Sequence, residues 1–469
     1  MRSLVGTSTI LSDLYNDNSG VVSNLGGTLQ IGLSIGNGMI TNAGTIALAG
    51  GILDAGVITN TGTVVGYGTL LAALANSRLV SATNGPLTLQ GYATGAGTYR
   101  AEAGATLSFN SGGTISSLFN TGGTIRVGAA SLVTNAATFN NAGTLAMAGG
   151  TYQSLTRLTN GPAAWITGNG TVNTPATLVN QGTILANHST LALVIGSALE
   201  STGRVLATTG RLIVSGIFTN DGTLNFQNSY GTFNSAVVNR GAWISDPSTL
   251  TFLASHTETT NGYINAGDGD RYVFQGDLVN QSTNKVLWNT LNVTPGTNTS
   301  GQGTTFLFQG TGLTQTQEFF QAGLALTSGF TGTPVPLSNG VQDVTSFAAV
   351  GGFQNNFAVG QLMLTNTTLA LAPTVPGGPP GALFVNDLFL FDLSHLVISN
   401  NMRLYFVNSN SWDMANITLL GSAEIHQLNS LTATTNLLVI PEPNVLLMWL
   451  SGVVTLWAAR RRARSRHRQ

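Results

Sequence analysis

Short stretches of alternating apolar and polar residues fill most of the chain, and small polar turns separate them. The stretch from Phe139 to Leu145 shows the unit: an apolar start, then Asn-Ala-Gly, then Thr and Leu. Asn and Gly enter the left-handed backbone region at low cost, so Asn-x-Gly predicts a sharp turn. Thr and the aliphatic residue after it favour extended backbone. The alternation therefore predicts short strands with one buried face.

The turn recurs at intervals of 18 to 24 residues from Asn24 onwards. Full copies of Asn-x-Gly-Thr begin at Asn42, Asn60, Asn141, Asn180 and Asn220, and looser copies at Asn24, Asn84, Asn120, Asn160, Asn239, Asn261 and Asn280. Glu102 and Ser201 fill the two remaining slots. A fixed period near twenty is typical of a solenoid, and three short strands with three turns fit each period. We therefore expect an all-β fold, a right-handed parallel β-helix.

Two other repeat architectures fit less well. Leucine-rich repeats share the period but need several fixed leucines in each repeat, whereas these repeats are rich in Gly, Thr and Ala. A propeller blade needs about twice the length. In a β-helix, equivalent residues stack, and an Asn amide carries both a donor and an acceptor. A column of Asn is therefore expected to form a hydrogen-bonded ladder.

Composition supports one elongated body with few charged residues. The chain has 59 Gly among 469 residues, 7% charged residues and 42% hydrophobic residues, which is too apolar for disorder. It has no Cys, which excludes disulfides and thiolate metal sites. Six arginines lie in the last ten residues, and without them 11 basic and 18 acidic residues give a net charge of −7. A body without a clustered basic face is not expected to bind nucleic acid.

The repeat and its interruptions suggest a division of the chain. The first residues lack a convincing export signal, because polar residues interrupt the apolar stretch after Met1, and we expect a truncated N-terminus with the signal upstream. The segments are 1–20 (N-terminal segment), 21–284 (regular β-helix), 285–372 (irregular continuation with insertions), 373–380 (Pro/Gly loop), 381–440 (capping strands and linker) and 441–469 (tail).

The tail has three parts in order: Pro441-Glu442-Pro443, an apolar run at 445–459, and an arginine cluster that begins with Arg460, Arg461 and Arg462. As a helix the run spans about 22 Å. That is short of the ~30 Å hydrocarbon core, but flanking arginines can snorkel to the membrane surface. We expect a single transmembrane helix with the arginines on the cytoplasmic side.

This ordered tail resembles the PEP-CTERM sorting signal, on the residues Pro441, Glu442, Pro443 and Arg460–Arg462. The resemblance covers about thirty residues. It implies that a membrane-embedded exosortase reads the Pro-Glu-Pro motif and processes the anchor. The repeats are also similar, in a general way, to the passenger regions of autotransporter-like and haemagglutinin-like surface proteins. The absence of an export signal departs from the sorting family's pattern.

Parallel β-helices also include polysaccharide lyases and hydrolases, so carboxylates need attention. The densest charged region runs from Asp246 to Asp277, with His256 and Arg271 nearby. Within it Glu258 and Asp277 each precede an Asn by three residues, so we expect them to stack about 4.8 Å apart, where close like charges invite a cation. Its ligand or cation candidates are Glu258, Asp268, Asp270 and Asp277.

We nevertheless favour solvated faces and turn-forming Asp over a site, since no nucleophile–base pair or metal-ligand spacing accompanies these residues. We assign no catalytic residue, metal ligand or cofactor. The sequence favours an exported, non-enzymatic, adhesin-like protein of the cell surface or extracellular matrix, transiently anchored in the inner membrane. Its expected partners are an exosortase-type enzyme, the membrane and, as a candidate, extracellular polysaccharide. The alternative is a β-helix polysaccharide lyase or hydrolase that uses the 246–277 carboxylates.

Overall fold

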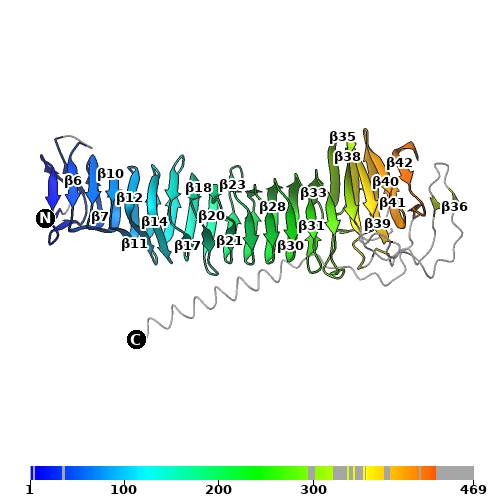
Figure 1. The fold of residues 1–469 in the computed structure, drawn as a ribbon, viewed down its shortest axis with the longest axis horizontal. Coiled ribbons are helices and arrows are strands. Elements are labelled where there is room, and N and C mark those ends of the chain that lie inside the picture. Colours follow the sequence, from blue (N-terminus) through cyan, green and yellow to red (C-terminus); the bar gives the residue numbers. More distant parts are fainter. Residues whose placement is uncertain are drawn as a thin grey trace, which may run out of the picture.

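The computed structural model of the chain shows a straight rod of stacked strands (Figure 1). The rod is a parallel β-solenoid of about 18 turns, which confirms the all-β repeat fold. The right-handed sense of the winding stays a prediction. The structure describes residues 2–3, 6–33, 37–293, 301–320, 335–336, 342–343, 352–353, 355–373, 381–410 and 414–428.

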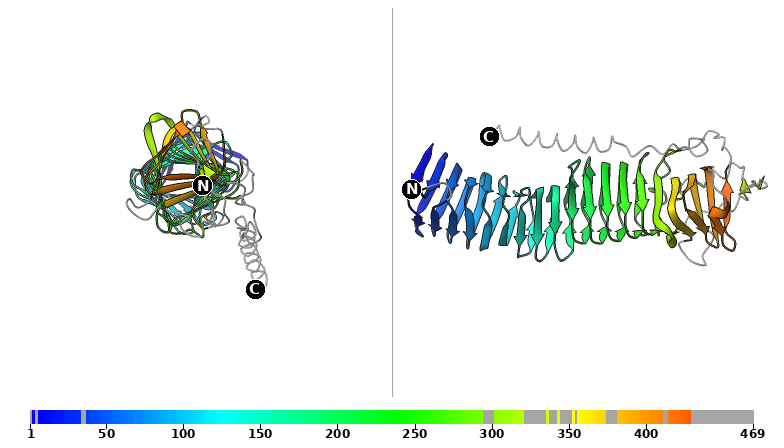
Figure 2. Two further views of the ribbon diagram at one scale, coloured as in Figure 1. Left: turned by 90° about the vertical axis from the view of Figure 1, so that its right-hand side faces the viewer. Right: turned by 90° about the horizontal axis from the view of Figure 1, so that it is seen from above.

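Each turn, or rung, places its strands in three parallel stacks that enclose a narrow core (Figure 2). In the first stack, for example, Phe139 pairs with Leu158 and Asn141 with Asn160. Several longer strands bend round a corner and belong to two stacks, as β28 does. The residues of one strand therefore lie directly over equivalent residues of the next.

The first stack runs the length of the rod. Its strands are β1 (Arg2–Ser3), β4 (Val21–Asn24), β7 (Thr45–Asp54), β9 (Thr63–Leu70), β11 (Leu79–Leu89), β12 (Ala93–Glu102), β14 (Gly113–Thr121), β17 (Phe139–Asn141), β19 (Leu158–Asn160), β21 (Leu178–Asn180), β24 (Leu199–Ser201), β27 (Phe218–Asn220), β29 (Val237–Asn239), β31 (His256–Glu258), β34 (Leu278–Asn280), β35 (Thr305–Phe320), β38 (Val359–Ala372), β40 (His395–Ile398) and β42 (Ile417–Leu419).

The second and third stacks share the long strands with the first. The second adds β2 (Thr7–Ile10), β5 (Thr28–Ile31), β13 (Thr106–Phe109), β15 (Thr124–Val127), β18 (Thr144–Ser154), β20 (Trp165–Asn173), β22 (Thr183–Ala186), β25 (Arg204–Thr208), β28 (Thr223–Phe233), β30 (Ala242–Phe252), β32 (Tyr263–Ala266), β41 (Met402–Ser409) and β43 (Glu424–Gln427). The third adds β3 (Leu14–Asn16), β6 (Met39–Asn42), β8 (Val57–Asn60), β10 (Ala73–Asn76), β16 (Leu132–Asn135), β23 (Ala192–Ile195), β26 (Arg211–Val214), β33 (Arg271–Phe274) and β39 (Gly381–Phe391). The short strands β36 (Val335–Pro336) and β37 (Gln342–Asp343) and the 3₁₀ turn η1 (Met414–Asn416) lie towards the C-terminal end.

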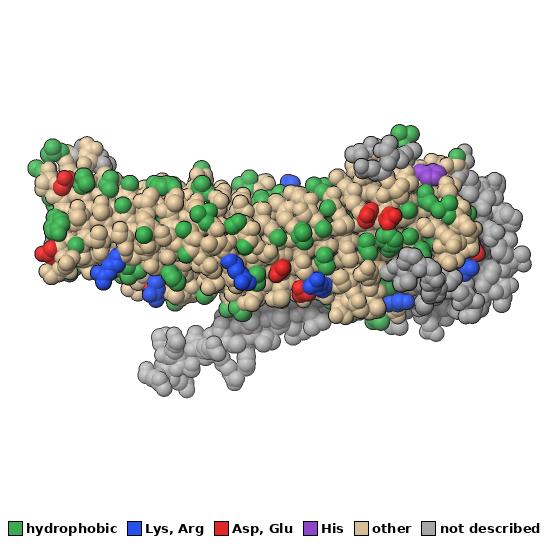
Figure 3. All heavy atoms as spheres, viewed as in Figure 1, with side chains coloured by type: hydrophobic (Ala, Val, Ile, Leu, Met, Phe, Trp, Pro, Cys, Tyr) green, Lys and Arg blue, Asp and Glu red, His purple; other side chains and the backbone are tan. Residues whose placement is uncertain are grey.

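The core is one continuous column of inward side chains. Alternate residues of each strand are buried, as in β28 and β30, because successive side chains of a strand point to opposite faces. Aromatic rings fill the middle of the column, where Phe233, Phe252 and Phe274 stack with centroids 5.2 and 5.0 Å apart. The outer surface is mostly polar without charge (Figure 3).

The expected Asn ladder exists, but it occupies two corners of the coil rather than one. One ladder joins Asn16, Asn42, Asn60 and Asn76 at the ends of third-stack strands, with N–O distances of 2.6 to 2.7 Å. The other begins at Asn120, at the end of the first stack, and continues through Asn141, Asn160 and Asn180 at 2.8 Å. Asn180 Nδ2 then donates to Ser201 Oγ at 2.9 Å, which confirms Ser201 as a repeat position.

Three of the expected repeat positions do not lie in the ladder. Asn84 has φ 61° and is exposed at a bend in β11, and Asn261 is exposed in a turn. Glu102 aligns with Thr121, whereas Ala101 aligns with the ladder residue Asn120. The inward positions belong to Asn76 and Glu258 instead. A turn residue and a ladder residue look alike in sequence, because Asn suits both.

Rungs also occur outside the regular segment. Strands β1 to β3 already pair with β4 to β6, ahead of residue 21. Strands β38 to β43 continue the coil at the other end. Among the residues that the structure describes, no helix has the length and apolarity needed to cross a bilayer. The transmembrane helix expected at 445–459 lies outside the described residues.

Candidate functional site

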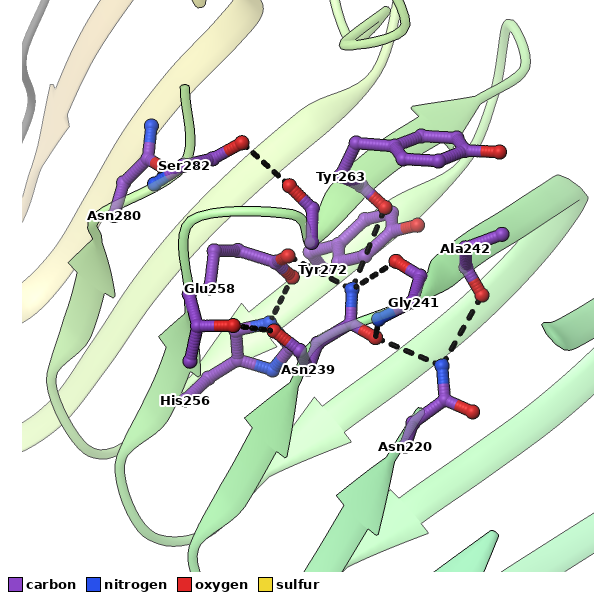
Figure 4. Close-up of polar contacts among 12 residues, drawn as sticks. Asn220, Asn239, Gly241, Ala242, His256, Glu258, Tyr263, Tyr272, Asn280 and Ser282 are labelled. Carbon is purple, nitrogen blue, oxygen red and sulfur yellow. Dashed lines mark hydrogen bonds and ion pairs between the residues drawn. The ribbon is translucent and has the colours of Figure 1, made fainter. Parts of the chain in front are cut away.

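Glu258 stands where the ladder would carry another asparagine. The first stack aligns it with Asn239 on one side and Asn280 on the other. Asn220 donates to Asn239 at 2.8 Å, and Asn239 Nδ2 donates to Glu258 Oε2 at 2.8 Å (Figure 4). A carboxylate has no N–H to pass on, so the chain of side-chain donors ends at this rung.

His256 completes the pair from the same face of β31. Its Nε2 lies 2.6 Å from Glu258 Oε1, and neither side chain has any exposed surface. The imidazole packs edge-on against Phe252 and Trp243, with ring centroids 4.6 and 5.0 Å away. The adjacent rungs place Val237 and Leu278 at this position. A buried ion-pairing group has therefore entered a column of aliphatic side chains.

The pair is held by few polar neighbours. Glu258 accepts from Asn239 and His256, and within the described ranges no Arg or Lys forms an ion pair with it. His256 Nδ1 is buried without a hydrogen-bond partner among those residues. Burial of an ionised group costs several kcal/mol unless a partner compensates the charge. The polar contacts of the Glu258 carboxylate among the described residues are therefore the His256 ring and the Asn239 amide.

Asp270 forms a second buried acid where the chain enters β33. Its carboxylate accepts from Ser245 Oγ at 2.7 Å, from Gly267 N at 2.6 Å and from Ser248 N at 2.5 Å. Ser245 Oγ also lies 2.7 Å from the hydroxyl of the buried Tyr272. Desolvation dominates over these donors and raises the pKa of Asp270 to about 7. Desolvation, and then the charge of Asp270, raises the pKa of Tyr272 well above its usual value.

The other two candidate carboxylates have structural contacts at the surface. Asp268 is exposed and accepts the Gly303 N–H at 2.7 Å, and Asp277 accepts the Glu318 N–H at 3.0 Å. The expected stacking of Glu258 on Asp277 is wrong. Glu258 aligns with Asn280, whereas the backbone carbonyl of Asp277 accepts from the His256 N–H. The four candidates therefore do not converge on one exposed site.

The buried acids are not accessible to a soluble substrate. Glu258 and Asp270 have no exposed surface, so neither can reach a glycan as an acid or base. Among the described residues, no group of three or more His, Asp or Glu is placed to hold a metal ion. The sorting residues Pro441, Glu442, Pro443, Arg460, Arg461 and Arg462 lie outside the described residues.

The His256–Glu258 pair was missed from the sequence, although a signal was present. Two residues that are two apart in a strand share a face, and Glu258 follows Asn239 by one period of 19 residues. Counting the repeat from the looser copy at Asn261 instead hides this alignment. Comparisons with protein-family models, with curated proteins and with solved structures found no significant match to this chain.

Proposed function

We propose that this protein is an exported, non-enzymatic rod of the cell surface or extracellular matrix, adhesin-like or structural in role. The observation that carries the proposal is the long coil itself, whose outer face is polar and nearly free of charge (Figure 3). About 18 turns at ~4.8 Å give a rod about 80 Å long. Such a body separates two ends by a fixed distance and offers a large polar surface with few charges to polymers or neighbouring rods.

The tail supports the route to that location. Its Pro441-Glu442-Pro443 motif, apolar run and arginine cluster suit a transient inner-membrane anchor that an exosortase-type enzyme removes. The membrane and that enzyme are thus proposed partners, and extracellular polysaccharide is a proposed ligand of the mature rod.

Mass spectrometry of the released protein tests this route. We expect the C-terminal peptide to end at or near Pro441-Glu442-Pro443, and Glu442→Ala to retain the protein in the membrane. Glu200→Ala, at an exposed position of β24, is the matched control and should be released normally. A released protein that still carries Gln469 would contradict processing at this motif.

The alternative of a polysaccharide-acting enzyme has a separate test. The purified body is incubated with acidic and neutral polysaccharides, and reducing ends and unsaturated products are measured. We expect none. The control variant is Asp221→Asn, because Asp221 is also a surface acid and lies 3.7 Å from Arg240. Product that disappears with Asp268→Asn but persists with Asp221→Asn would replace the structural proposal with an enzymatic one.

A further inference from the structure

One face of the coil carries no charge over successive rungs of its N-terminal half. The third-stack segments of these rungs contain no Asp, Glu, Lys or Arg; they are 14–16, 39–42, 57–60, 73–76, 92–95, 112–115 and 132–135. We call their outward side the uncharged face. The exposed Asp13, directly ahead of β3, marks its N-terminal limit. A charged partner that covered this face would lose hydration without gaining a counter-charge.

A column of hydroxyl groups runs along the uncharged face. Its positions align in register from rung to rung, and all except Ala75 carry a hydroxyl: Tyr15, Thr41, Thr59, Ala75, Thr94, Thr114 and Thr134. Neighbouring rungs lie ~4.8 Å apart, so the column is about 29 Å long. The face therefore offers hydrogen-bond donors and acceptors at a regular spacing parallel to the rod axis.

A column of exposed apolar side chains lies beside the hydroxyls, two residues earlier in each strand. Its members are Met39, Val57, Ala73, Tyr92 and Leu132. The four larger residues are between 38% and 49% exposed. Isolated exposed apolar side chains are ordinary, but a continuous row with a polar margin is typical of a binding surface.

Two tyrosine rings lie on the same face. Tyr92 leans along the sheet, because its hydroxyl lies 2.8 Å from Thr114 Oγ1 in the next rung. The position over which it leans belongs to Gly112, which has no side chain to hold the ring away from the sheet. One side of the ring is therefore left open to solvent, with 44% of the residue exposed. Tyr15, in the hydroxyl column, is 71% exposed and lies about 19 Å further along the rod.

We propose that the uncharged face binds a neutral polysaccharide chain that lies along the rod, with sugar rings stacked on Tyr92 and Tyr15 and sugar hydroxyls bonded to the threonine column. The inference rests on the proposed function as an extracellular rod and names the surface and the class of polymer. A sugar ring has a weakly apolar face and hydroxyls around its edge, which matches the two adjacent columns. The polymer is neutral because these segments contain no Arg or Lys to pair with uronate or sulfate groups.

A second copy of the chain or an extended peptide fits this face less well. A strip about 29 Å long and about 13 Å wide covers about 380 Å², less than half of the ~800 Å² that each partner in a standard protein interface buries. A peptide would bring backbone N–H and C=O groups, whereas the backbone of these strands already pairs with the rungs on either side. A sugar chain is narrow enough for the strip and brings hydroxyls that threonine can satisfy.

Affinity electrophoresis of the full chain in mild detergent tests the proposal. Native gels contain hydroxyethylcellulose, galactomannan or dextran as neutral polymers, or alginate as an anionic one, and mobility is expressed relative to a gel without polymer. We expect retardation by at least one neutral polymer and none by alginate. Tyr92→Ala should raise the dissociation constant for that polymer about tenfold, because the stacked ring is lost. The matched control is Phe119→Ala, which removes a similarly exposed ring from the first-stack part of β14 and should bind normally.

A second pair of variants tests the absence of charge. Thr59→Lys places a cation in the middle of the uncharged face and should weaken binding, whereas Asn140→Lys, at an exposed position of β17, should not. If Tyr92→Ala fails to fold, Thr59→Lys and the comparison of polymers with the wild-type chain still decide.

The proposal is overturned if none of the three neutral polymers retards the chain, if alginate retards it equally, or if Tyr92→Ala and Thr59→Lys both bind like the wild type. A wild-type dimer in sedimentation that both substitutions return to monomer would assign the face to a second copy instead. Processing at Pro441-Glu442-Pro443 is measured separately, so failure of this inference is distinguishable from failure of the proposed function.

Discussion

Asn141 is the best place to test whether the ladder holds the rungs together. Its Oδ1 accepts from Asn120 Nδ2 at 2.8 Å, and its Nδ2 donates to Asn160 Oδ1 at 2.8 Å and to the Trp165 carbonyl at 2.9 Å. The side chain is 1% exposed. Asn140, its neighbour on β17, is exposed and supplies a control that differs only in the direction of the side chain.

The cost of Asn141→Ala follows from the groups left behind. Asn120 Nδ2 keeps a bond of 3.1 Å to the Thr144 carbonyl, so it is not orphaned. The buried Asn160 Oδ1 and the partly buried Trp165 carbonyl both lose the amide that they accept from, and a buried group left unsatisfied costs about 1–3 kcal/mol. We therefore expect a loss of about 3 kcal/mol, against at most about 0.5 kcal/mol for Asn140→Ala.

The assay must be local, because a long repeat array need not unfold in a single step. Hydrogen exchange of β17 and β19 measures the opening of these rungs, and a loss of 3 kcal/mol corresponds to a drop in protection of about a hundredfold. Asn141→Ser should lie between the two, since Ser201 already occupies a ladder slot. Equal protection in Asn141→Ala and Asn140→Ala would refute the claim that the ladder stabilises the coil.

Two further substitutions test the packing of the rungs. Gly62→Ala would place a Cβ 2.0 Å from the Gly44 carbonyl oxygen and should lower the thermal midpoint strongly, whereas Gly104→Ala, with open space but φ +75°, should cost only about 1–2 kcal/mol. Phe252→Ala removes a ring from the central stack and should cost about 3–5 kcal/mol, measurable in urea by the fluorescence of the adjacent Trp243.

Local chemistry made the fold predictable from the sequence, but it could not identify the corner of each turn. Asn-x-Gly-Thr specifies a turn followed by a strand, and this holds at both Asn60 and Asn141. The motif does not say which of three equivalent corners it occupies. The ladder moves from the third-stack corner to the first-stack corner between Asn76 and Asn120. The preceding ladder residues, Asn60 and Asn76, are only 16 residues apart. Only the stacking of whole rungs decides such a shift.

The same limit explains the error at the candidate site. Counting from Asn261 puts Glu258 in line with Asp277 and predicts a stacked pair of acids. Counting from Asn239 places it in the ladder, as the structure has it. A shift of a few residues moves a carboxylate from solvent to core, because side chains alternate between the two faces of a strand. The burial of Asp270 had no sequence signal of this kind, since Asp-Gly-Asp is an ordinary turn sequence.

Because the chain has few charged residues, each buried acid has a large effect on how its stability depends on pH. With 7% charged residues, the coil has few groups whose ionisation can affect its stability, and those on the outer face are screened by water and salt. A carboxylate in the core is not screened, so each proton that it gains or loses acts on folding at nearly full strength. In a stack of similar rungs, each rung depends mainly on its two neighbours, so a rung weakened in this way opens first and opens locally. Desolvation raises the pKa of Asp270 to about 7, so its ionisation as the pH rises from about 4 to 7 should weaken the rungs around β33, with the ladders on either side remaining closed.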